Sequence, residues 1–402
     1  MLALSFALAA ALCAPPPSAG DEAAPRYALV CGRVLTMDGG DAIHERGMLL
    51  VDGGRIAYVG AETEVPDGYE VLEHRELWAV PGMIDLHSHV QTGGWGDIND
   101  MVLPVNPELS TSPTIVPSNR SVRLACAGGV TTLFGIPGSG TSIGGFGVLY
   151  KTKTDATYDE AVLADPGGMK VAQSHNPERR AGDLGRTQAG LYWLLEDIAD
   201  KALAADRQGR ADPQLENLRR VLKGELPVLI HCAAAYGVQN TVRLWKGRYD
   251  TLCTVSHGSF NGYKMAEYVA AMDVPVNHGP RTADWRYSRE GRLVGIAAEY
   301  VKAGVPNFSL NTDANVLPQE ELFLQGSMSA RLGADAYQML RAVTIHPAKS
   351  FGIDDRVGSL EPGKDADVVL WSGNPLDPRS RVELVLIDGR IQYDRQRDGQ
   401  WF

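Results

Sequence analysis

Short apolar runs alternate with helix-like segments through the middle of the chain. Runs such as Gly129–Ile136, Leu226–Cys232 and Val305–Asp313 are too short for helices and are typical of buried strands. Between such runs, segments such as 186–203 and 319–332 repeat apolar residues every three or four positions, as helices do. Strands that alternate with helices predict a parallel sheet. The number of units is sufficient for an α/β fold of the (β/α)8 type, a TIM-like barrel.

Both ends of the chain follow a different pattern, in which apolar and polar positions alternate as they do along strands. Tyr27–Ala61 contains two such runs joined by an Asp-Gly-Gly turn at 52–54, and the C-terminal part repeats this style around a second Asp-Gly turn. Turns of this kind between alternating runs indicate hairpins. We expect residues 27–80 and 355–402 to form one small composite β-sandwich, and residues 81–354 to form the barrel.

Composition narrows the class of protein without naming a function. The chain has 402 residues, of which 44% are hydrophobic and 22% charged, as in ordinary globular proteins. The net charge of −11 argues against a nucleic-acid-binding face, which would be basic. The N-terminus carries an apolar run of about a dozen residues followed by small residues, a pattern typical of secretory signals and too short to span a membrane. We expect residues 1–20 to be a signal peptide and the protein to be exported, periplasmic or secreted, without a membrane span.

The candidate chemistry begins at Val80–Val90, which reads VPGMIDLHSHV. Residues two apart on a strand point to the same face, so His87 and His89 would project side by side from a strand end. Two imidazoles placed in this way can hold a divalent metal ion. Strands of a barrel bring such ends together at one rim. Further candidates fall in, at or just after the ends of other predicted strands: Lys170, His175, His231, His257 and Asp313.

These motifs, with the tail HPAKSFGIDDRVGSLEPGKDADVVLWSGNP at 346–375, resemble the amidohydrolase superfamily. Within it, the chain is similar to exported imidazolonepropionase-like and Xaa-Pro-dipeptidase-like members, over nearly the whole mature length. The resemblance implies a metal-dependent hydrolase in which His87, His89 and Asp313 bind one metal. It also implies that His231 and His257 bind a second metal, or one metal and the substrate.

Three positions bear on the number of metal ions that the resemblance implies. Lys170 matches the position at which many members carry a carboxylated lysine that bridges two metals. Close relatives would have a glutamate in a Gly-Glu-Asn-Pro turn where this chain has His175, and a second histidine where it has Ala233. A neutral imidazole cannot replace a bridging carboxylate charge for charge. We therefore favour one divalent ion, with zinc as the first choice, and keep two ions as the alternative.

The predicted reaction is hydrolysis of a C–N bond in an amide, a cyclic amide or a peptide-like substrate, in the EC 3.5 or 3.4 class. Zinc can lower the pKa of a water ligand from about 15.7 to about 7, which creates a hydroxide nucleophile at neutral pH. Asp313 would take the proton of this water and pass it to the leaving nitrogen, as base and then acid. His257 would donate to the oxyanion if it is not a ligand. Two alternatives stay open: a heterocycle deaminase on the same fold, and a homologue that has lost catalysis and binds only a metal or a ligand.

Three residues are candidates for substrate binding. Trp95, in the long loop after the His-x-His motif, could wall the pocket, and Arg281 could bind a substrate carboxylate in bidentate fashion. His278 ends an apolar run, where it could either line the pocket or pack in the core. The glycine-rich stretch 135–147 lacks the ending of a phosphate-binding loop, so we expect a mobile loop over the barrel mouth. The expected partner is a small molecule or a short peptide, and a homo-oligomer is possible.

Overall fold

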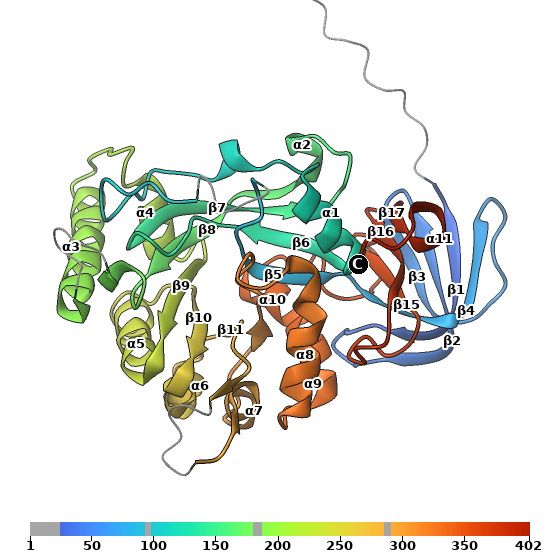
Figure 1. The fold of residues 1–402 in the computed structure, drawn as a ribbon. Coiled ribbons are helices and arrows are strands. Elements are labelled where there is room, and N and C mark those ends of the chain that lie inside the picture. The colour runs from blue at the N-terminus through green and yellow to red at the C-terminus, as the bar shows by residue number, and fades with distance from the viewer. Residues whose placement is uncertain (1–24, 93–97, 180–186, 285–290) are drawn as a thin grey trace, which may run out of the picture.

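The computed structural model describes residues 25–92, 98–179, 187–284 and 291–402 (Figure 1). Its largest sheet has eight strands and curls into a nearly closed barrel. In hydrogen-bonding order the strands are β14 (Ser309–Leu310), β11 (Val276–His278), β10 (Cys253–Ser259), β9 (Val228–Ala233), β8 (Val162–Ala172), β7 (Ile143–Lys151), β6 (Val130–Gly135) and β5 (Met83–Ser88). The His89 amide donates to the carbonyl of Ala314 at 2.8 Å, and this bond joins the ends of β5 and β14. The predicted TIM-like barrel is therefore confirmed.

One strand of the barrel departs from the prediction. Strand β7 is antiparallel to both β6 and β8, whereas the other pairings of this sheet are parallel. The second half of the stretch 135–147, which we expected to be a mobile loop, is the buried first half of β7. Glycine is needed there because a Cβ on Gly147 would lie 2.6 Å from the Phe134 ring. The expectation of a loop was wrong for this second half, because glycine in the strand serves close packing rather than flexibility.

Helices cover the outside of the barrel (Figure 1). The predicted helices at 186–203 and 319–332 are present as α3 and as the pair η5 and α8. The α-helices are α1 (Arg120–Ala127), α2 (Tyr158–Ala161), α3 (Gln188–Arg207), α4 (Glu216–Leu222), α5 (Ala234–Thr241), α6 (Ala266–Ala271), α7 (Ile296–Lys302), α8 (Leu322–Arg331), α9 (Ala336–Ala342) and α10 (Ile345–Ser350). Shorter elements are η1 (Ser112–Thr114), η2 (Pro177–Arg179), η3 (Val242–Arg248), η4 (Phe260–Met265), η5 (Gln319–Glu321) and the small strands β12 (Ala283–Asp284) and β13 (Val294–Gly295). Within the described ranges, none of these helices has the length and apolar character required to cross a bilayer.

The second sheet combines the strands β1–β4 with the C-terminal strands β15–β17, which lie side by side in Figure 1. Its seven strands, in hydrogen-bonding order, are β17 (Arg390–Asp394), β16 (Val382–Ile387), β15 (Val368–Trp371), β4 (Glu70–Pro81), β1 (Tyr27–Leu35), β2 (Ile43–Asp52) and β3 (Arg55–Ala61), and α11 (Arg395–Asp398) follows. The pairing of β15 with β4 connects the C-terminal strands to the N-terminal ones. The strands form one hydrogen-bonded sheet, so the sandwich arrangement and the bounds 27–80, 81–354 and 355–402 stay predictions.

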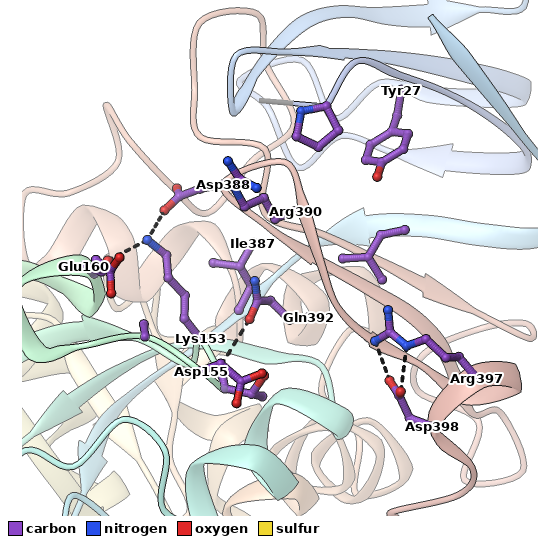
Figure 2. Close-up of a pocket in the computed structure, with 14 residues that line it drawn as sticks. Tyr27, Lys153, Asp155, Glu160, Ile387, Asp388, Arg390, Gln392, Arg397 and Asp398 are labelled. Atoms are coloured by element: carbon purple, nitrogen blue, oxygen red, sulfur yellow. Dashed lines mark hydrogen bonds and ion pairs between the residues drawn. The ribbon is translucent and has the colours of Figure 1, made fainter. Parts of the chain in front are cut away.

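Lys151, at the end of β7, fastens the barrel to this terminal sheet. Its side chain is only 3% exposed, and its Nζ lies 2.6 Å from Asp365 and 3.1 Å from Asp367, with Asp388 as a third ion-pair partner. A neighbouring cavity of about 790 Å³ lies between the segment after β7 and the β16–β17 hairpin (Figure 2). At its edge, Lys153 pairs with Asp388 at 2.7 Å. The two parts of the fold thus meet through charged contacts, most of them buried.

Candidate metal centre

Five of the predicted side chains converge at the end of the barrel where the parallel strands finish. They come from four parts of the sheet: His87 lies in β5 and His89 directly follows it, His231 lies in β9, His257 lies in β10, and Asp313 follows β14. The imidazole centroids are 4.5 Å apart for the pairs His87–His257 and His231–His257, and 5.1 Å apart for His87–His89. The four histidines are buried, and the side chain of Asp313 is 18% exposed. Residues far apart in sequence therefore form one cluster.

The cluster contains two groups of three potential ligand atoms that share His87. The groups are His87, His231 and His257, and His87, His89 and Asp313, and the atoms within each lie within 4.8 Å of one another. In the second group, Asp313 Oδ1 is 3.3 Å from His87 Nε2 and 3.4 Å from His89 Nε2. Two ligands of a tetrahedral zinc ion with bonds of about 2.0–2.1 Å lie about 3.3 Å apart. These distances fit a divalent ion at this point.

Hydrogen bonds at Nδ1 orient the four imidazoles with Nε2 toward the cluster. The Nδ1 partners are Ser256 Oγ at 2.7 Å for His87, the Ile136 carbonyl at 3.0 Å for His89, Ser139 Oγ at 2.9 Å for His231, and the Gly279 carbonyl at 2.7 Å for His257. A carbonyl oxygen only accepts, so Nδ1 of His89 and His257 carries the proton. In the described part of the chain, the buried Nε2 atoms of His87, His231 and His257 have no hydrogen-bond partner. Buried polar atoms are rarely left unpaired, and such lone pairs are what a metal ion binds.

The protonation states of these groups also suit a cation. Burial, followed by the nearby positive charges, lowers the pKa of His87 and of His231 well below the ordinary histidine value, so both rings are neutral near pH 7. Burial alone would raise the pKa of Asp313, but the hydrogen bond with His89 and the surrounding cationic groups lower it. Neutral imidazoles and an ionised carboxylate are the forms that bind zinc.

Asp85 is a supporting residue beside the cluster that the sequence analysis missed. It is fully buried, and one carboxylate oxygen accepts from the amide of His87 at 2.8 Å. Its other oxygen accepts from the amide and hydroxyl of Thr312, at 3.0 and 2.7 Å, and from Gln319 Nε2 at 2.7 Å. Asp85 therefore ties β5 to the segment that leads into Asp313. The available signal was its position two residues before His87, on the same face of the strand.

Lys170 lies beside the cluster, in β8, and is fully buried. Its Nζ donates to Ser139 Oγ at 2.8 Å and to the Pro137 carbonyl at 3.5 Å. Burial lowers the pKa of this amine to about 7. Neither group of potential ligands includes His175. Metal binding by Lys170 and His175, and carboxylation of Lys170, stay predictions.

The predicted substrate-binding residues fall in different places. Arg281 is exposed, and its guanidinium carbon lies 4.7 Å from the centroid of the Phe260 ring. The imidazole of His175 is stacked on the same ring, at 5.4 Å and 16°. These three side chains form a surface element that we call the Phe260 platform. Trp95 and the segment 1–20 lie outside the described residues.

His278 is the last residue of β11, and its side chain packs in the core, away from solvent. It is fully buried, with its ring centroid 6.2 Å from Tyr300 and 6.1 Å from Phe308. Its Nδ1 donates to the carbonyl of His257 at 2.7 Å. This packing favours the core role that the sequence left open, and His278 supports the backbone of His257 rather than lining an open pocket.

The chain is similar to proteins of known family. A family model described as the amidohydrolase family matches residues 288–392. Amidohydrolase tasK of Hapsidospora irregularis is 24% identical over 421 residues, covering 88% of this chain and 40% of that protein. Imidazolonepropionase of Paracoccus denitrificans is 26% identical over 417 residues, covering 89% and 97%. The chain thus spans less than half of the first relative and nearly all of the second. The crystal structure of an amidohydrolase from Thermotoga maritima MSB8 matches with a TM-score of 0.82 and 29% identity, over 92% of this chain and 100% of that one.

Proposed function

Because the chain belongs to the amidohydrolase superfamily, we propose that it is a metal-dependent hydrolase of a C–N bond in an amide, a cyclic amide or a peptide-like substrate. The observation that supports this most strongly is the convergence of four imidazoles and Asp313 at one end of the barrel. Three of those imidazoles have buried Nε2 atoms without a hydrogen-bond partner among the described residues. The same end of a barrel carries the active site in other enzymes of this architecture.

His87, His89 and Asp313 would hold one divalent ion, with His231 and His257 as further ligands or as the ligands of a second ion. Zinc is the first choice because imidazole nitrogens and a carboxylate oxygen are its usual ligands in catalytic sites. When bound, such an ion polarises a carbonyl oxygen and lowers the pKa of water from about 15.7 to about 7. The Nδ1 bonds of the histidines keep the rings oriented for this binding.

Asp313 would be the residue that moves a proton. Among the five converging side chains it is the most exposed, so it faces the open side of the cluster, where substrate and water arrive. Its lowered pKa keeps the carboxylate ionised near neutral pH, as a general base must be. It would accept a proton from the attacking water and return it to the leaving nitrogen. His257, if free of metal, would donate to the oxygen of the tetrahedral intermediate.

The variant Asp313→Asn tests this role. We expect kcat to fall by about 10²–10⁴-fold, because an amide cannot accept the water proton. Rates are measured as amine release from a panel of dipeptides and cyclic amides. The matched control is Asp155→Asn, because that carboxylate is 88% exposed and does not belong to the buried cluster. The rates of this variant should equal those of the wild type. A variant at 313 that retains kcat within threefold would contradict the assignment.

The Phe260 platform would recognise an anionic end of the substrate. Arg281 is exposed there, and a guanidinium binds a carboxylate through two parallel hydrogen bonds. We expect Arg281→Met to raise KM about 10–100-fold for substrates with a free carboxylate and to leave KM unchanged for their neutral amides, because only the charge-assisted bonds are lost. Arg379→Met, at a side chain that is 90% exposed, is the control. Equal changes for both substrate classes would show that Arg281 does not read the carboxylate.

Deamination is the second candidate, favoured by a relative named 5-methylthioadenosine/S-adenosylhomocysteine deaminase from Symbiobacterium thermophilum, which is 22% identical over 92% of this chain. Metal content per chain, measured together with ammonia release from purines and pyrimidines and amine release from dipeptides and lactams, separates the two candidates. We expect about one transition-metal ion per chain, and turnover of the dipeptides and lactams. Tight ligand binding without turnover under added zinc, manganese or cobalt would instead indicate a protein that has lost catalysis.

A further inference from the structure

A buried serine lies between two of the predicted site residues. Ser139 is 7% exposed, and its Oγ is 2.9 Å from His231 Nδ1 and 2.8 Å from Lys170 Nζ. We propose that Ser139 is a positioning residue of the metal centre, which fixes the orientation of His231, accepts the Nδ1 proton of its metal-binding tautomer and holds Lys170 beside it. The proposal rests on the proposed function insofar as it assigns His231 to the metal.

The hydrogen-bonding capacity of the hydroxyl matches both neighbours. For His231 to bind a metal through Nε2, the neutral ring must carry its proton on Nδ1, and that N–H then needs an acceptor. Ser139 Oγ is the acceptor at hydrogen-bond distance, and Lys170 Nζ donates to the same atom. A hydroxyl has two acceptor lone pairs, so it satisfies both donors at once. The other acceptor for Lys170, the Pro137 carbonyl, is at the longer distance of 3.5 Å.

The turn that carries Ser139 is itself held in place by the loop that follows β5. The amide of Gly138 donates to the Ile98 carbonyl at 2.6 Å, and the amide of Gly140 donates to Asn99 Oδ1 at 3.0 Å. A Cβ on Gly138 would lie 2.1 Å from Asn99 Nδ2, so a larger residue there would have to displace the Asn99 side chain that holds Gly140. The position of Ser139 is therefore fixed by the backbone contacts of its turn with Ile98 and Asn99, and by the two side chains that Ser139 contacts.

The proposal is tested with Ser139→Ala, in two measurements that do not depend on turnover. Zinc affinity, measured by competition with a chromogenic chelator, should fall about 10–100-fold, as it does when the residue that orients a metal-binding histidine is lost. The ¹⁵N signal of His231 Nδ1 in the metal-free protein should move, because its hydrogen bond is gone. Ser139→Thr keeps the hydroxyl and should restore both readouts. Ser139→Gly removes the hydroxyl with no added bulk and carries the same test if the alanine variant does not fold.

Thr141→Val is the matched control in the same turn. Thr141 is buried, and its hydroxyl has no hydrogen-bond partner in the described part of the chain, so valine removes an unused hydroxyl without changing shape. Zinc affinity and the His231 signal should equal those of the wild type. Equal losses in Thr141→Val and Ser139→Ala would overturn the proposal, because the effect would then belong to packing of the turn. Unchanged affinity and signal in Ser139→Ala would overturn it as well. If the wild type hydrolyses nothing but the His231 signal still responds to Ser139, the proposed function fails and the positioning role stands.

Discussion

Replacing His87 by alanine is expected to abolish metal binding and to lower C–N hydrolysis by about 10³-fold or more, on the scale of a lost catalytic group. His87 is the one residue common to both ligand groups, so its loss disrupts each of them. Its Nε2 is buried, lies 3.3 Å from Asp313 Oδ1, and has no hydrogen-bond partner within the described ranges. The measurements are metal content per chain and the rate on the amide panel.

The control for this substitution is His74→Ala, which removes an imidazole from β4 in the terminal sheet. It should leave metal content and rate unchanged. Thermal unfolding of both variants shows that the fold is retained. A His87→Ala protein with wild-type activity, or with its full metal content, would contradict the assignment of the metal centre.

A second comparison counts the ions. If one ion is held by His87, His89 and Asp313, then the His231→Ala protein should still bind this ion, with a lower affinity. If two ions are bound, the same variant should fall from about two ions per chain to about one, since a divalent ion held by neutral imidazoles loses one of its few ligands. Metal analysis of His231→Ala beside His87→Ala therefore decides between the two arrangements that the sequence left open.

Replacing Lys151 by methionine is expected to destabilise the protein by about 3–5 kcal/mol, the usual result of removing one partner of a buried ion pair. Its ammonium is surrounded by three aspartates, of which Asp365 and Asp367 have side chains only 1% and 4% exposed. Asp365 keeps a partner in Arg356, at 2.7 Å, so the uncompensated charge falls on Asp367. The change is measured as a lower midpoint of urea unfolding at an unchanged m-value.

The loss should depend on pH in a definite direction. Burial raises the pKa of Asp367 above its ordinary value, so the Asp367 carboxyl group binds a proton more tightly in the folded state than in the unfolded state. The destabilisation is therefore full above the folded-state pKa and shrinks as pH falls through it. Adding Asp367→Asn to the Lys151→Met background should recover part of the stability at neutral pH.

The control for this prediction is Lys201→Met. Lys201 pairs with Asp197 on the surface of α3, and its side chain is 62% exposed. Exposed pairs of this kind contribute about 0–1 kcal/mol, so the midpoint should hardly move. A loss in Lys151→Met as small as in this control would show that the aspartate cluster does not fasten the two parts of the fold.

The parallel strands of the barrel could be predicted because buried strands leave continuous apolar runs, such as Leu226–Cys232 around β9. The five converging side chains could be found because each lies in or just past such a run. Strand β7 was missed, since its glycines, Gly145 and Gly147 among them, suggest a loop until the partner side chains are known. Ser139 was missed because its contacts are with residues remote in sequence, which no local spacing reveals. Asp85 has a local signal in its spacing from His87, but its bonds to Thr312 and Gln319 depend on the closed barrel.

The hydrogen bonds between Asp85 and Thr312 connect β5 to the segment after β14, where the two edges of the barrel sheet meet. The predicted ligands lie on both sides of this junction. His87 lies in β5, the first barrel strand, and His89 directly follows it, while Asp313 follows β14, the last. An ion held by these three residues would link the two edge strands of the barrel. Its occupancy would then be coupled to closure, since whatever binds only the closed form stabilises it by mass action. Chelation would loosen the protein first along this edge, where amide hydrogen exchange would reveal it.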